Sequence, residues 1–80
     1  MNIEFLKGNF SKEEALDLLT QIVHIKIKFH EKKIEKSDME EDTKMREQRI
    51  KKLQQDFYDA KIFIMSKEKD CELNAEINII

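Results

Sequence analysis

The chain has 80 residues, 40% of them charged and 40% hydrophobic, with a formal net charge of −2 at pH 7. This length allows a single small domain, residues 1–80, and leaves a sufficient core difficult to bury without disulfides, a metal or oligomerisation. Cys71 is the only cysteine, which excludes an intrachain disulfide and fits a reducing compartment. The absence of proline and the single glycine favour long helices over turn-rich β structure.

The N-terminal segment, residues 1–10, begins with apolar and polar residues in alternation, from Met1 to Phe5. A period of two is typical of a strand, so this segment is predicted to be extended. It lacks the basic and then apolar run of a signal peptide, and no stretch of the sequence approaches the ~20 apolar residues of a membrane span. We therefore expect a soluble, cytoplasmic protein that does not insert into a membrane.

A first helix is predicted over residues 11–36, with Ser11 and Glu14 at the spacing of a capping box. Its apolar residues form two adjacent stripes that together cover an arc of roughly 200°, whereas packing on one neighbour needs about 100°. The first stripe consists of Ala15, Leu18, Ile22, Ile25 and Phe29, and the second of Leu16, Leu19, Val23, Ile27 and Ile34. The excess predicts a homodimer, in which two hairpins form a four-helix bundle. The predicted dimer interface consists of Leu16, Leu19, Val23, Ile27, Tyr58, Ile62 and Met65.

Residues 37–39 are predicted to form a turn and residues 40–67 a second helix, capped by Ser37 with Glu40 or by Asp38 with Glu41. The apolar residues of this helix follow the 3-4 spacing of an antiparallel helical hairpin. The predicted register places Phe29 in the core and pairs Ile25 with Ile50, Ile22 with Leu53, Leu18 with Phe57 and Ala15 with Ala60. The predicted fold class is thus all-α, an antiparallel two-helix hairpin.

The C-terminal tail, residues 68–80, leaves two alternatives open. From Cys71 to Ile79 apolar and polar residues alternate, which predicts a short strand that pairs with the N-terminal segment at the open end of the hairpin. Cys71 and Ala75 also keep the phase of the second helix, so a continuing helix is the rival interpretation.

No catalytic, cofactor-binding or metal-binding residue is predicted. His30 and Glu31 open like a zinc-binding His-Glu-x-x-His helix, but Ile34 occupies the position of the second ligand. The acidic segment from Asp38 to Asp42 lacks the glycine and the closing glutamate of a calcium loop. Cys71 has no histidine near it in sequence, and we expect it to be a small core residue.

The middle of the chain is mildly basic: residues 24–52 hold ten Lys and Arg against seven acids, whereas both ends are acidic. The leading hypothesis is a non-enzymatic interaction or regulatory protein that acts as a homodimer and can bind a protein partner. The alternative is a nucleic-acid-binding regulator that uses the basic hairpin tip, although interspersed glutamates weaken that hypothesis. The contact residues expected at the tip are Lys26, His30, Lys33, Arg46, Arg49 and Lys52.

Overall fold

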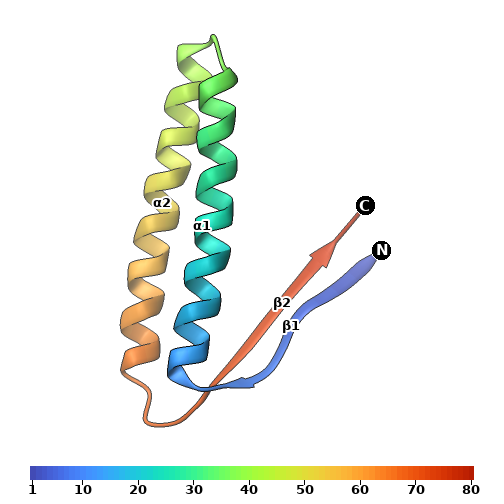
Figure 1. Ribbon diagram of the computed structural model, residues 1–80, viewed down its shortest axis with the longest axis vertical. Coiled ribbons are helices and arrows are strands. Elements are labelled where there is room, and N and C mark those ends of the chain that lie inside the picture. Colours follow the sequence, from blue (N-terminus) through green and yellow to red (C-terminus); the bar gives the residue numbers. More distant parts are fainter.

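The computed structural model describes residues 1–80 and contains two strands and two helices. In chain order these are β1 (Asn2–Phe10), α1 (Lys12–Lys36), α2 (Glu40–Met65) and β2 (Cys71–Asn78). The helices form an antiparallel hairpin, and the strands pair into a two-stranded antiparallel ribbon that leaves from its open end (Figure 1). The predicted hairpin and the predicted strand pairing are confirmed. The all-α assignment is too narrow, because the terminal segments form a sheet.

The two helices begin in different ways. At α1 the backbone N–H of Glu14 donates to Ser11 Oγ at 3.1 Å, and the backbone N–H of Ser11 donates to Glu14 Oε1 at 2.9 Å. This is the predicted capping box, and its hydrogen bonds hold the pKa of Glu14 below the ordinary value. At α2 the N-cap is Met39, and no side chain caps the helix. Both capping boxes predicted for α2 are therefore wrong.

The short connection between the helices explains this difference. Ser37 is already the C-cap of α1, where its backbone N–H donates to the carbonyl of Ile34. Its hydroxyl accepts a hydrogen bond from the Met39 backbone N–H at 3.2 Å and so closes the turn. With Ser37 bound there, the first turn of α2 retains only the favourable charge of its acidic residues.

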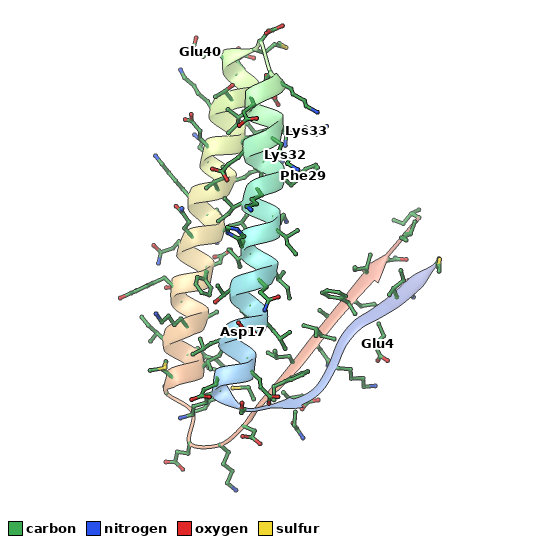
Figure 2. The ribbon with its side chains drawn as sticks, in the orientation of Figure 1. Glu4, Asp17, Phe29, Lys32, Lys33 and Glu40 are labelled. Carbon is green, nitrogen blue, oxygen red and sulfur yellow. The ribbon has the colours of Figure 1, made fainter.

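The ribbon has one apolar and one polar face. Phe10, Leu6 and Ile3 pair with Cys71, Ala75 and Ile77, and a one-residue shift at Phe5 keeps the apolar side chains together. Gly8, opposite Leu73, has a φ of 140°, a backbone conformation that favours glycine. Figure 2 shows Glu4 projecting from the outer side of the ribbon. Because side chains alternate along a strand, the apolar face is turned toward the helices.

The core lies at the open end of the hairpin, where helices and ribbon meet. Ala15, Ile64 and Cys71 are buried there, each from a different element, as predicted for Cys71. The partly buried side chains packed against them are Phe10, Leu16, Leu19 and Leu73. Because these residues come from all four elements, the small cluster fixes the ribbon to the hairpin.

The contact line between the two helices differs from the predicted register. On α2 the half-buried residues keep the predicted spacing through Ile50, Leu53 and Phe57. On α1, however, Ile25 is 69% and Phe29 is 53% exposed, so their assignment to the core is wrong. His30 is buried instead. The second stripe of α1 is half-buried along its whole length, whereas the first is covered only at its base, at Ala15, Leu18 and Ile22.

The molecule is open rather than compact. Its radius of gyration is 15.1 Å, whereas about 12 Å is expected for a compact domain of this length. In Figure 1, α1 lies between α2 and the ribbon, and the ribbon diverges from α1 toward the two termini. Its end is held by hydrogen bonds between Met1 and Ile79, far from the core. Only the base of the ribbon therefore packs on the helices.

Candidate functional site

The predicted dimer interface separates into two groups. The members on α1, which are Leu16, Leu19, Val23 and Ile27, are all half-buried within the single chain. Those on α2 remain exposed: Tyr58 at 59%, Ile62 at 52% and Met65 at 59%. The first group is therefore largely engaged in the hairpin and its junction with the ribbon, and the second group is the part that remains open to a partner.

A second exposed apolar surface was missed in the sequence. Figure 2 shows Phe29 projecting from α1 on the side where the ribbon lies. Helical periodicity places Ile25 on the same face of α1, and the apolar face of the ribbon carries Ile3 and Ile77 opposite it, all four of them exposed. We call these four side chains the inner surface. The signal was present, because Ile25 and Phe29 belong to the first apolar stripe of the sequence.

A polar pair joins the two helices toward the tip. Arg46 Nη1 donates a hydrogen bond to His30 Nδ1 at 3.1 Å. Arg46 Nε lies 3.5 Å from Asp42 Oδ2, but it is sealed from solvent without a hydrogen-bond partner. The guanidinium is thus fixed between a carboxylate of its own helix and the imidazole of the other.

The surroundings of His30 favour its neutral form. Burial is the main cause that lowers the pKa of His30 below its ordinary value of 6.5, and the positive charges of Arg46, Arg49 and Lys26 lower it further. The imidazole is therefore neutral at pH 7. Arginine can only donate, so Nδ1 acts as the acceptor in this hydrogen bond.

Four of the six predicted contact residues line one recess. Lys26 and His30 from α1 meet Arg49, Lys52, Leu53 and Asp56 from α2 around an open volume of about 250 Å³. Lys52 Nζ donates to Asp56 Oδ1 at 2.7 Å, and this bond raises the pKa of Lys52. Arg46 lies in the contact between the helices, bonded to His30, and is not part of the lining. We call this hollow the recess.

The remaining predicted contact residue, Lys33, belongs to a neighbouring patch on α1. Its Nζ lies 5.7 Å from the centre of the Phe29 ring, in a cation–π arrangement. Lys32 and Lys36 flank the same ring and complete a shallow pocket. The rings of Phe29 and His30 meet edge to face with their centres 5.8 Å apart, so this patch adjoins the recess.

The chain defines a small α+β class of protein, a helical hairpin with a terminal two-stranded ribbon. No protein-family model matches it, and neither a curated protein nor a solved structure does. No three His, Cys, Asp or Glu side chains lie together in a way that could hold a metal ion. Neither helix contains a stretch long and apolar enough to cross a membrane.

Proposed function

We propose that the protein is a non-enzymatic interaction protein that acts as a homodimer through its exposed apolar surfaces. The observation that carries this proposal is the area that the single chain leaves uncovered. Its accessible surface is 6791 Å². A compact monomer of 9.6 kDa exposes roughly 5,100 Å², so the chain exposes about 1,700 Å² more than its size requires.

This excess has the size of a dimer interface. If two copies each covered about 1,700 Å², the total of roughly 3,400 Å² would fall in the range of obligate homodimers. Large apolar side chains are part of the uncovered area, among them the inner surface and the group of Tyr58, Ile62 and Met65 on α2. Exposed large apolar side chains that gather on one surface favour burial against a partner over permanent exposure to water.

A second copy is the occupant that fits this surface. The inner surface presents an α-helical and a strand face that diverge from a common base, so two copies related by a two-fold axis can each cover the open face of the other. A small net charge of −2 per chain opposes such pairing only weakly. The helices of two copies would then form the predicted four-helix bundle. A cytoplasmic location stays a prediction.

Sedimentation equilibrium over a wide concentration range tests this function, with Ile25→Asp as the disruptive variant. We expect the unaltered chain to be a dimer at micromolar concentration. Ile25→Asp should be monomeric, because a charge buried at the dimer contact costs several kcal/mol. His24→Asp is the matched control: His24 is exposed on the same helix, about 100° away from Ile25, and should leave the dimer intact.

Two results would overturn the proposal. One is a monomeric unaltered chain at concentrations where its helical circular dichroism shows it folded. The other is an equal response of the Ile25→Asp and His24→Asp variants, which would remove the dimer contact from the inner surface. A heterologous protein partner would then be the remaining candidate for the apolar surfaces.

Nucleic-acid binding is the second candidate function, and one specific observation favours it. Single-stranded nucleic acids bind to exposed aromatic rings beside cationic side chains. Phe29 has both properties, because it is exposed and lies among Lys32, Lys33 and Lys36. A shift of a single-stranded oligonucleotide that weakens steeply with added salt would support this function. A low-salt preparation with a clean protein absorbance spectrum and no such shift would contradict it.

A further inference from the structure

The recess gathers hydrogen-bond donors from both helices at one point. Lys26 comes from α1, and Arg49 and Lys52 come from α2. Two of these cations, Lys26 and Arg49, have no ion-pair partner within the chain. The single acid in the lining, Asp56, is bonded to Lys52. The recess therefore carries a local excess of positive charge.

His30 adds a donor that is built into the fold. Its Nδ1 accepts the bond from Arg46, so the proton of the neutral ring resides on Nε2. Nε2 has no partner within the chain. Only one side-chain nitrogen or oxygen in the chain is both sealed from solvent and without a hydrogen-bond partner, and that atom is Arg46 Nε. Because His30 Nε2 also has no partner, it must be accessible to solvent. Only 4% of His30 is exposed, and the residue lines the recess.

The surrounding acids are turned largely to other sides of the helices. With about 100° per residue, Glu31 lies roughly 140° around α1 from Lys26, and Glu47 lies roughly 160° around α2 from Arg49. In Figure 2, Glu40 projects from the top of α2 on the side away from Phe29, Lys32 and Lys33. The glutamates that alternate with basic residues in the sequence are thus largely separated from them in space.

We propose that the recess is a binding site for the oxyanion of a phosphate group, held by Lys26, Arg49 and Lys52 and by the Nε2–H of His30. An oxyanion accepts from several donors at once, and charge-assisted hydrogen bonds of this kind are the strong ones. Burial is the main cause that lowers the pKa of His30, and the positive charges of Arg49 and Lys26, which lower it further, also attract an anion to the recess. This site does not depend on dimer formation, since every residue in it comes from one chain.

Titration of the two histidines by NMR, with sodium sulfate as a probe whose charge does not change near neutral pH, tests the site. Sodium chloride at equal ionic strength is the reference. Sulfate in the recess should raise the pKa of His30, because the anion stabilises the imidazolium against Lys26, Arg46, Arg49 and Lys52. Exposed His24, the other histidine of the chain, is the internal control, and its NMR signals should be the same in sulfate and in chloride. Equal responses of His24 and His30 would overturn the proposal.

A pair of charge-matched double variants locates the site. Lys26→Gln with Lys52→Gln removes two cations from the recess, and we expect sulfate affinity to fall about tenfold. The control is Lys28→Gln with Lys51→Gln, which removes one lysine from each of the same two helices. Lys28 is two residues from Lys26 and Lys51 is one residue from Lys52, but both lie outside the recess. If both double variants lose affinity equally, binding reflects net charge and the proposal fails. Circular dichroism confirms that each variant is folded.

Two further probes distinguish the sources of the phosphate group. If inorganic phosphate raises the pKa of His30 and a short single-stranded oligouridylate does not, the ligand is a small phosphorylated molecule. If the oligouridylate binds with a steep salt dependence and the recess double variant weakens it, the ligand is a nucleic-acid backbone. If no probe moves His30, the recess binds no oxyanion.

Discussion

The two ends of the hairpin are held together by different chemistry. At the open end, Ala15, Ile64 and Cys71 form a dry contact between the helices and the ribbon. Toward the tip, the buried contact is the hydrogen bond from Arg46 to His30. Apolar burial scales with the area removed from water, whereas a polar contact contributes about 1 kcal/mol net. The open end should therefore supply most of the stability, and the tip half is free to carry polar function.

Ile64→Ala is expected to give the largest loss, because it removes a buried side chain from the small cluster at the open end. We predict a decrease of about 2–4 kcal/mol in the free energy of unfolding, measured by urea denaturation followed with circular dichroism. Ile62→Ala, two residues earlier on the same helix, is the control, since Ile62 is 52% exposed. At protein concentrations below the dimer dissociation constant, Ile62→Ala should lower the free energy of unfolding much less than Ile64→Ala. Equal losses would contradict the placement of the core.

The pH dependence of stability tests the polar contact at the tip. The pKa of His30 is lowered in the folded chain from its ordinary value of 6.5, so the unfolded chain binds a proton first as the pH falls. The free energy of unfolding should be constant above pH 6.5 and decrease as the pH falls toward the lower, folded-state value. The charged groups near His30 are Lys26 on its own helix and Arg46, Arg49, Lys52 and Asp56 on α2, and Asp42 lies behind Arg46, 3.5 Å from its Nε.

Single substitutions of the two histidines separate their contributions to this pH dependence. His30→Gln should flatten the decrease between pH 6.5 and the range where carboxylates titrate. His24→Gln should leave it unchanged, because His24 is exposed and takes no part in the polar pair. Thermal melting at a series of pH values provides the measurement. A decrease that survives in His30→Gln would show that another group causes it.

The smallest predicted effect is a gain. Met39 has the extended backbone of an N-cap, with φ −103° and ψ 120°, but no side-chain oxygen to accept from the first turn of α2. Met39→Ser should stabilise the chain by about 0.5–1 kcal/mol, seen as a higher melting temperature. Met45→Ser, the same change within α2, is the control and should give no gain. A melting temperature equal to that of the control would mean that the start of α2 is frayed.

Much of the fold can be predicted from the sequence. Ser11 and Glu14 mark the start of α1, and the alternation from Cys71 onward indicates the strand that pairs with β1. The rotation of α1 about its own axis could not be predicted, because the sequence shows two adjacent stripes of similar hydrophobicity, either of which could pack on α2. Only the three-dimensional packing around Ala15 and Cys71 determines which stripe is used, and this rotation brings His30 to the contact and leaves Ile25 exposed.

The candidate site could be predicted in part for the same reason. The basic charge of the hairpin tip predicts six contact residues, and the structure places four of them around the recess, without Lys33 and Arg46. The donor on His30 Nε2 could not be predicted, since it depends on which ring nitrogen faces Arg46. Nor could the exposure of Phe29, which follows from the rotation of α1.

The ribbon joins the two ends of the chain, and this has a consequence for the order of folding. Contacts within the hairpin close a loop of only residues 37–39, whereas the bond between Met1 and Ile79 spans a separation of 78 residues. Contacts between distant residues require a larger loss of chain entropy and form more slowly. The hairpin should therefore assemble first and bring Phe10 and Cys71 together. Pairing of the ribbon then proceeds outward from these residues to the termini, which close last.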